Sequence, residues 1–359
     1  AGKGAAIQRH FMHRLIEAGQ PLRPTPYSYV LTPHNMGFLS DSALAAMMIG
    51  RHPGYAQPIM ITLGDPAFAN LLGRSQMTAE ADQLIDFYRN RFGDHLRFQG
   101  AGNIIRSAGF HSYDTAVNFL LNAAALAPIL TSGVLTVNPS DVCAPPPPWG
   151  QTVPLPNQTQ TGINVATVLL TAGDARYVCL FDGGVNGGGY DTHQNDHLGA
   201  TSSGIFNLCT ELAAHIQDPA LPLDPNKINL DDTMIVINTE FGRWPTPSGG
   251  RDHWPLGFAQ ILIGGPVNGP PPSGQQRAPQ ISGGIDTSWG GALPIQVGGQ
   301  SVAALTPTDL HAAVLLAAGV DPLAQDNFHV GVEGLGPAIE GSTDFETLIN
   351  LRTRVLGVP

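Results

Sequence analysis

Two short apolar segments, each followed by a polar loop, constrain the fold more than any other feature of the sequence. Residues 177–182 and 233–239 have the length and apolar content of buried strands, with a helix expected over 198–217 between them. Residues 258–263 form a further apolar segment of the same kind. Strands that alternate with helices favour a mainly parallel sheet with helices on both faces. We therefore expect an α/β fold, a three-layer α/β/α sandwich with a mostly parallel central sheet.

The loops after the first two strands concentrate oxygen and nitrogen donors. The first loop runs from Asp182 through Gly187-Gly188-Gly189 to Tyr190-Asp191-Thr192-His193. The second contains Thr239-Glu240-Phe241-Gly242-Arg243 and then Arg251-Asp252-His253-Trp254-Pro255. In an open α/β sheet, ligands bind beyond the carboxyl ends of the strands. Carboxylates and imidazoles grouped there suit a divalent metal ion such as Zn²⁺, Mn²⁺ or Ca²⁺.

The spacing of these donors assigns them a shared role. Asp191 and His193 are two residues apart, so a loop can bring both to one ion. Glu240 follows its strand directly and is a candidate ligand. The structural alternative is an ion pair with Arg243, three residues on. The two roles are compatible, because ligand carboxylates are usually held by neighbouring groups. Asp252 and His253 add an adjacent oxygen and nitrogen donor. The predicted metal ligands are Asp191, His193, Glu240, Asp252 and His253.

Several neighbouring residues have structural interpretations that compete with a functional one. Asp182 is as well suited to bracing the glycine loop through backbone amides as to binding an ion. Cys179 and Cys209 lie in a predicted strand and helix, where buried free thiols are expected. A phosphate-cradling glycine loop is a further alternative, but neither a Walker pattern nor GxGxxG is present. Asn157-Gln158-Thr159 matches a glycosylation sequon, a pattern with little specificity.

Charge and hydropathy exclude some classes of function. The formal net charge is −11 and no basic cluster is present, which argues against a general nucleic-acid binder. No apolar stretch approaches the roughly 18 residues of a membrane span. Three cysteines are too few for a disulfide framework. If the protein is exported, we expect its targeting segment to have been removed ahead of residue 1.

The rest of the chain is consistent with one domain over residues 1–359. Further helices are expected over 5–18, 79–92, 101–127 and 306–319, and further strands over 27–31 and 58–63. Two segments rich in Pro and Gly, 139–160 and 264–299, interrupt this pattern. We expect both to be loop excursions of the same domain, the second forming loops or a small hairpin.

The motif set resembles the DUF1501 family. The resemblance rests on Gly188-Gly189-Tyr190-Asp191-Thr192-His193, Asp231-Asp232-Thr233, the two segments around Glu240 and His253, and Thr306-Pro307-Thr308-Asp309-Leu310-His311-Ala312. That family is similar to the alkaline phosphatase and sulfatase superfamily, whose α/β/α sandwich carries metal ligands at strand ends. By this resemblance, Asp191 with His193, Glu240, and Asp252 with His253 are three groups of metal ligands.

The resemblance also implies a function and a location. Members are typically bacterial and exported, so a periplasmic or extracellular location is expected. The implied activity is metal-dependent hydrolysis of a small anionic phosphate or sulfate ester, with Arg243 steadying the anionic group. The early segment with the family's Gly-Gly-Pro-Ser and Asp residues is not evident; we expect it to be processed, separately encoded or lost. The alternative is a non-catalytic subunit of an envelope or extracellular assembly that binds a protein partner.

Overall fold

The computed structural model describes the following parts of the chain: residues 27–32, 59–63, 79–100, 112–113, 116, 136–137, 155–172, 175–182, 190, 198–239, 242–245, 251–254, 256–265, 267, 281–286, 288, 290–297, 299–319, 321–323, 339, 341 and 343–358. These residues fall into two compact units. Unit 1 contains the described residues up to Tyr190 together with 198–228, and unit 2 contains those from Asn229 onward. That the whole chain is one domain stays a prediction.

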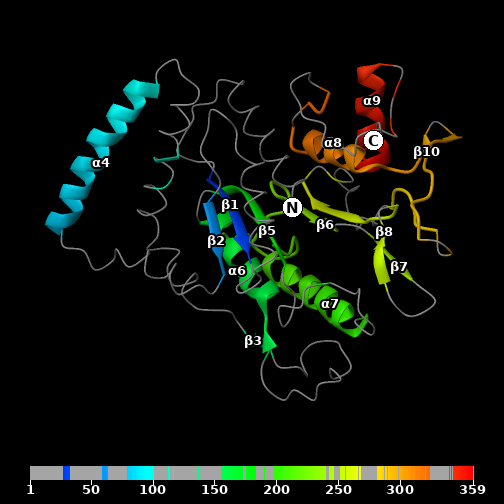
Figure 1. Ribbon diagram of the computed structural model, residues 1–359, viewed down its shortest axis with the longest axis horizontal. Coiled ribbons are helices and arrows are strands. Elements are labelled where there is room, and N and C mark those ends of the chain that lie inside the picture. The colour runs from blue at the N-terminus through cyan, green and yellow to red at the C-terminus, as the bar shows by residue number, and fades with distance from the viewer. Residues whose placement is uncertain are drawn as a thin grey trace. The chain divides into compact units, whose positions relative to one another are not determined.

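Unit 1 is built on a three-stranded parallel sheet. Its strands are β1 (Tyr27–Thr32), β2 (Ile59–Thr62) and β5 (Ala175–Leu180), in the order β2-β1-β5. Leu31 of the central strand is in register with Ile61 on one side and Leu180 on the other. Figure 1 shows the three strands side by side with α6 across them. All three carboxyl ends therefore lie at one edge of the sheet.

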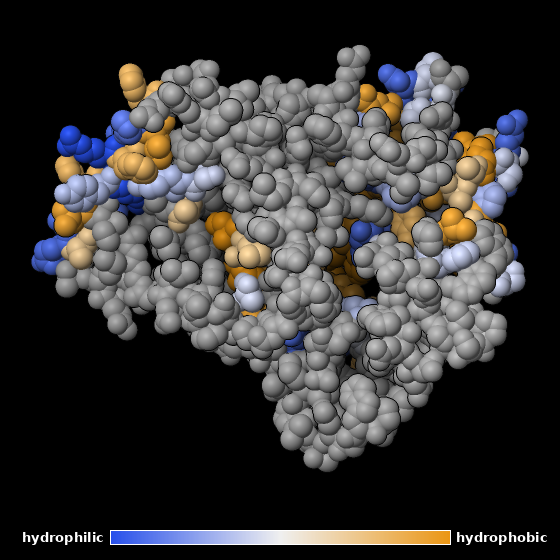
Figure 2. Space-filling view, in the orientation of Figure 1, coloured by the Kyte–Doolittle hydropathy of each residue, from blue (hydrophilic) through white to orange (hydrophobic). Residues whose placement is uncertain are grey.

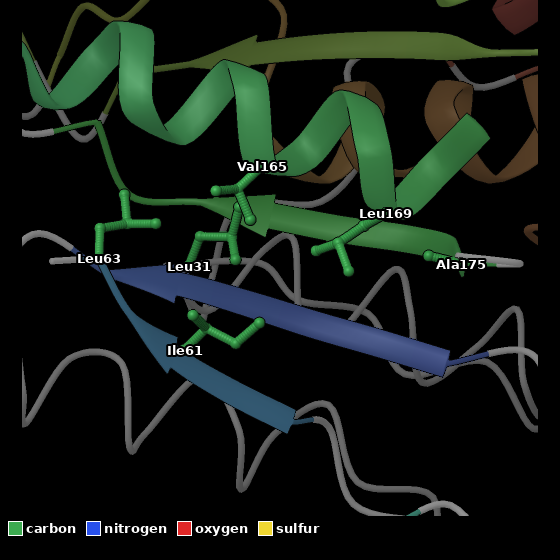
Figure 3. Close-up of a cluster of buried hydrophobic side chains, with 6 residues drawn as sticks. All are labelled: Leu31, Ile61, Leu63, Val165, Leu169 and Ala175. Atoms are coloured by element: carbon green, nitrogen blue, oxygen red, sulfur yellow. The ribbon is translucent and has the colours of Figure 1, made fainter. Parts of the chain in front are cut away.

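A helix covers one face of this sheet and forms the core of unit 1. Helix α6 (Gln158–Thr171) places Val165 and Leu169 against Leu31 of β1, and Figure 3 shows these side chains between helix and strands. Leu31 and Leu169 are completely buried. Burying a side chain of this size contributes about 1.5–3 kcal/mol each. This apolar contact fixes the height of α6 over the sheet.

Helix α7 (Leu198–His215) packs on α6 through polar side chains at helical spacing. The amides of Asn157 and Asn207 exchange two hydrogen bonds, at 3.0 and 2.8 Å, and both residues are buried. Asn157 also caps α6, because its side chain accepts from the backbone N–H of Gln160. A reciprocal amide pair satisfies both partners without water, so the two helices have one preferred register.

The remaining elements of unit 1 are smaller or more exposed. Strands β3 (Thr136–Val137) and β4 (Leu155–Pro156) form a short antiparallel pair. Helix α4 (Ala79–Gly100) carries a stripe of exposed apolar side chains, Leu84, Phe87, Tyr88 and Phe92, at spacings of three, one and four. Figure 2 shows apolar groups over α4 among hydrophilic ones. The Tyr113 ring contacts Phe92 edge-on at 5.0 Å.

Unit 2 contains three antiparallel strand pairs. Strand β6 (Met234–Asn238) pairs with β9 (Gln260–Gly264), and Val236 lies opposite Leu262. The segment between them forms the hairpin of β7 (Gly242–Pro245) and β8 (Arg251–Trp254). Strands β10 (Gln296–Val297) and β11 (Gln300–Ser301) form a third, very short pair.

One buried carboxylate, that of Asp309, connects the start of α8 with a distant residue of unit 2. Helix α8 (Pro307–Ala317) begins with a capping box in which Asp309 accepts from the backbone N–H and hydroxyl of Thr306, both at 2.6 Å. The other oxygen of Asp309 accepts from the backbone N–H of Ile339 at 3.1 Å. Helix α9 (Asp344–Asn350) and the π-helical segment η3 (Leu351–Val355) follow, and Leu351 packs with Ile339 and Ala313. Asp309 is therefore a structural residue.

The structure confirms a mixed α/β fold and corrects several details. Parallel strand pairing within the described residues is confined to β2-β1-β5, and β6 pairs antiparallel with β9 although both were expected in a parallel sheet. The polar loop expected after Glu240 is in part the β7–β8 hairpin. Cys209 is exposed on α7, not buried, and Cys179 is partly buried. Among the described residues, no helix is long and apolar enough to cross a membrane.

Candidate functional site

The predicted ligand residues divide into two groups by what the structure describes. Asp191, His193 and Glu240 lie outside the described residues. Arg243 belongs to β7, and Asp252 and His253 belong to β8; for these three the backbone alone is described. Within the part of the chain whose side chains are described, no three His, Cys, Asp or Glu residues converge on one point. The five-residue metal site therefore stays a prediction.

The hairpin register brings two of the predicted residues together along the backbone. Arg243 pairs directly with His253, and Trp244 pairs with Asp252. The sequence alone does not predict that Arg243 and His253 are neighbours, because ten positions separate them. The antiparallel pairing makes them cross-strand neighbours. The predicted anion-steadying residue and a predicted metal ligand thus share one rung of the β7–β8 ladder.

Asp182 lies at the carboxyl edge of the parallel sheet, and both of its carboxylate oxygens accept hydrogen bonds. The backbone N–H of Phe181 donates to the Leu31 carbonyl at 2.9 Å, so the ladder continues one residue past β5. Asp182 follows, and one of its carboxylate oxygens accepts from the Thr159 hydroxyl at 2.6 Å. The other accepts from the Tyr190 hydroxyl. The described partners of Asp182 are thus two hydroxyl groups. Its expected bonds to backbone amides of the glycine loop fall on residues 183–189, which lie outside the described residues.

Tyr190 returns the chain to the sheet edge directly before Asp191. Its hydroxyl, besides bonding Asp182, lies 3.3 Å from the Gly204 carbonyl of α7. Its ring occupies the space beside Gly204, where an added Cβ would come within 2.7 Å of a ring carbon. Burial, and then the Asp182 carboxylate, raise the pKa of Tyr190, so the phenol stays protonated and can donate. Asp182 and Tyr190, which flank positions 183–189 in the sequence, are thus hydrogen-bonded directly to each other.

Helix α7, which carries Gly204, is held by a second polar contact toward its end. The Nδ1 atom of His215 lies 2.7 Å from the Glu211 carbonyl oxygen, and its Nε2 atom lies against the Asn164 amide of α6. Burial raises the pKa of Glu211, whereas the nearby His215 and a hydrogen bond from Gln160 lower it. Asn207, Glu211 and His215 are four residues apart, so they share one face of α7. This polar face sets the position of Gly204 relative to α6.

In unit 2, the residue that precedes Glu240 is also hydrogen-bonded, in this case to one residue of the neighbouring segment. The Thr239 hydroxyl donates to the Ala259 carbonyl at 2.8 Å and accepts from the Ala259 N–H at 3.0 Å. The Thr239 N–H adds a third bond between the two residues, to the Ala259 carbonyl at 3.2 Å. The β6–β9 pair therefore extends to the point at which the chain reaches Glu240.

The Asp231-Asp232-Thr233 segment builds a turn that leads into β6. Asn229 accepts from the backbone N–H of Asp231 through its side chain, and from Thr233 through its carbonyl, both at 3.0 Å. The Thr233 hydroxyl donates to Asp232 at 2.9 Å. Both carboxylates are exposed, so these residues shape the entry to the strand.

Sequence reasoning missed the residues that anchor the loops. Thr159, Tyr190 and Thr239 were not singled out, because a hydroxyl group adjoining a motif has no distinctive spacing of its own. Their common signal is position: Tyr190 and Thr239 each directly precede a predicted ligand. Asn157, by contrast, belongs to the sequon, but it is buried and fully engaged, which makes it a structural amide.

Comparison with known proteins supports the family resemblance over about half of the chain. Residues 157–331 match the model of a family described as "Protein of unknown function (DUF1501)". The matched segment begins at Asn157, the cap of α6, and includes Asp182, Tyr190 and both predicted ligand loops. No curated protein and no solved structure matches the chain. The resemblance is confirmed for this segment, and the relation to the alkaline phosphatase superfamily stays a prediction.

Proposed function

We propose that this protein is a metal-dependent hydrolase of small phosphate or sulfate esters. The observation that carries the proposal is the Asp182–Tyr190 hydrogen bond at the carboxyl edge of the β2-β1-β5 sheet. It holds Tyr190, the residue directly before the Asp191-Thr192-His193 motif, at the edge where α/β sheets bind ligands. Both carboxylate oxygens of Asp182 accept hydrogen bonds from hydroxyl groups. We therefore assign the ligand role in this loop to Asp191 and His193.

The donor set fits a divalent metal ion. Asp191, His193, Glu240, Asp252 and His253 would hold it, and a set of three carboxylates and two imidazoles suits Zn²⁺ or Mn²⁺ better than Ca²⁺, which prefers oxygen. When bound, such an ion supplies Lewis acidity toward an ester oxygen and toward a water or hydroxyl nucleophile. The protein's own contribution is to hold the donors in a fixed arrangement.

Arg243 is the residue proposed to bind the anionic part of the substrate. A guanidinium presents parallel N–H donors that match two oxygens of a phosphate or sulfate group. Its place opposite His253 in the β7–β8 hairpin ties this donor to a predicted ligand through a backbone ladder. A change at either residue is therefore expected to affect substrate binding and metal binding together.

The same proposal includes a fold and a location. The parallel β2-β1-β5 sheet under α6 supports a three-layer α/β/α sandwich with a mostly parallel central sheet, of the alkaline phosphatase type. By the family resemblance we propose that the protein is exported to the periplasm or beyond. A twin-arginine leader on the encoded precursor would support that location, and export of a reporter fused to the precursor would test it.

Glu240→Gln tests the proposed function. The full-length protein is loaded separately with Zn²⁺, Mn²⁺ and Ca²⁺, analysed for bound metal, and assayed with 4-nitrophenyl phosphate and 4-nitrophenyl sulfate. We expect bound metal and turnover in the wild type. The isosteric amide removes the ligand charge, so Glu240→Gln should lower metal occupancy while the protein stays folded.

The matched control is Glu80→Gln, which makes the same change at an exposed position of α4 and should alter neither metal content nor turnover. Unchanged metal occupancy in Glu240→Gln would exclude Glu240 as a ligand. A wild type without metal and without turnover would contradict the hydrolase proposal. It would favour the alternative, a non-catalytic subunit that binds a protein partner.

A further inference from the structure

Two segments at the carboxyl edge of the parallel sheet are joined by one tyrosine side chain. Asp182 leaves β5 and Tyr190 returns eight residues later, and the Tyr190 hydroxyl donates to the Asp182 carboxylate. The second oxygen of that carboxylate accepts from Thr159, which is completely buried near the start of α6. Tyr190 is therefore bonded to a carboxylate whose own orientation is fixed by a hydrogen bond from helix α6.

The ring of Tyr190 is fixed from a second side by α7. Gly204 provides the space for the ring, since a Cβ there would lie 2.7 Å from one ring carbon and 3.3 Å from two others. Gly204 is itself buried, and the Asn157–Asn207 pair holds the next turn of α7 against α6. Within unit 1, Tyr190 thus contacts the sheet edge with its hydroxyl and α7 with its ring.

We infer that Tyr190 is a positioning residue for the metal ligand Asp191, which follows it directly in the chain. This inference rests on the proposed function, because it takes Asp191 to be a ligand. Consecutive Cα atoms are 3.8 Å apart across a trans peptide, so fixing Tyr190 limits where Asp191 can lie. The glycine run before Tyr190 offers no side chains that could provide this restraint from the other direction.

The inference predicts a specific loss of metal affinity. Groups that orient metal ligands typically contribute 10–100-fold to affinity. Tyr190→Phe removes only the hydroxyl, and we expect the dissociation constant for the metal to rise about tenfold. Gly204→Ala keeps the hydroxyl and every charge but displaces the ring, and it should raise the dissociation constant similarly. Because both changes act on one contact, the double variant should bind about as weakly as either single variant.

The experiment titrates the full-length wild type and the variants with Zn²⁺ and with Mn²⁺, and measures the melting temperature of each metal-free protein. The control is Tyr177→Phe, which removes the hydroxyl of a half-buried tyrosine from β5 of the same unit. We expect Tyr177→Phe to lower the melting temperature without changing the dissociation constant. Tyr190→Phe and Gly204→Ala should weaken metal binding beyond any effect of lost stability.

Each outcome separates this inference from the proposal on which it rests. If the wild type binds metal and both variants bind it equally well, Tyr190 is only a structural residue, and the hydrolase proposal still stands. If Gly204→Ala fails to fold, Tyr190→Phe alone decides the question, since it adds no atoms. A wild type that binds neither ion overturns the proposed metal site and this inference with it.

Discussion

At the scale of single residues, the side chains that hold this structure in register are amides and hydroxyls. Asn157 illustrates this, because one buried amide both caps α6 and forms the reciprocal pair with Asn207 of α7. Neither role is visible in the sequon to which Asn157 belongs. The same holds for Asp309, whose two oxygens connect the start of α8 with Ile339.

Asn157→Ala should therefore destabilise unit 1 by about 2–4 kcal/mol, from a lost helix cap and an unpaired buried amide at Asn207. Urea unfolding followed by circular dichroism measures this loss. Asn226→Ala, at an exposed turn, is the control and should stay within about 0.5 kcal/mol of the wild type. A loss at Asn157 no larger than at Asn226 would contradict the role assigned to the amide pair.

At the scale of elements, α6 mediates between the sheet and α7 through two kinds of contact. Toward the sheet it is apolar and closely packed, with Gly162 directly over Leu180 of β5. Toward α7 it is polar, with Asn157, Gln160 and Asn164 facing the row of Asn207, Glu211 and His215. The apolar side provides most of the stability, and the polar side fixes the register.

Gly162→Ala tests the apolar contact. A Cβ at this position would lie 2.5 Å from a terminal carbon of Leu180. Overpacking of this kind costs about 1–3 kcal/mol, and the gain in helix propensity is at most about 1 kcal/mol. We expect a net loss of about 1 kcal/mol in the free energy of unfolding. In a Leu180→Ala background, where the space is free, the same change should be neutral or stabilising.

Glu211→Gln tests the polar contact through its pH dependence. Because burial raises the pKa of Glu211, the folded protein retains this proton at pH values where the unfolded chain has released it. Its contribution to stability therefore falls as the pH rises upward from the ordinary glutamate pKa. Gln does not titrate, so Glu211→Gln should raise the melting temperature at pH 7 relative to the wild type, with a smaller difference at pH 4. A difference that grows toward low pH would have the wrong sign.

At the scale of the whole molecule, the two predicted ligand loops belong to segments that are anchored at the residue before the ligand. Tyr190 holds the first of these in unit 1, and Thr239 holds the second in unit 2. Asp191 and Glu240, two of the proposed metal ligands, directly follow these two hydrogen-bonded residues in the sequence.

Chelation should therefore destabilise the protein as a whole. Binding stabilises the native state by about 2.7 kcal/mol at a hundredfold excess over the dissociation constant. We expect a chelator to lower the melting temperature of the wild type, and to do so much less in His193→Ala. Asp191→Ala combined with His193→Ala should cost little more than either change alone, since both remove one ion. Equal chelator sensitivity in wild type and His193→Ala would show that His193 is not a ligand.

The sequence by itself determined the local elements with strong periodicity and the placement of the candidate loops. Strands β1, β2, β5, β6 and β9 and helices α7 and α8 occur where apolar spacing predicted them, because burial imposes that spacing on each element. It also predicted the DUF1501 resemblance, which the match over residues 157–331 confirms.

Only the tertiary structure decided how these elements pair and which polar groups are used for structure. The antiparallel pairing of β6 with β9 and the β7–β8 hairpin depend on long-range backbone hydrogen bonds that leave no periodic trace in a polar segment. The engagement of Asp182 by Thr159 and Tyr190 likewise joins residues 23 and 8 positions away. Such contacts are selected by the packing of α6 and α7, and a residue type alone does not specify its distant partner.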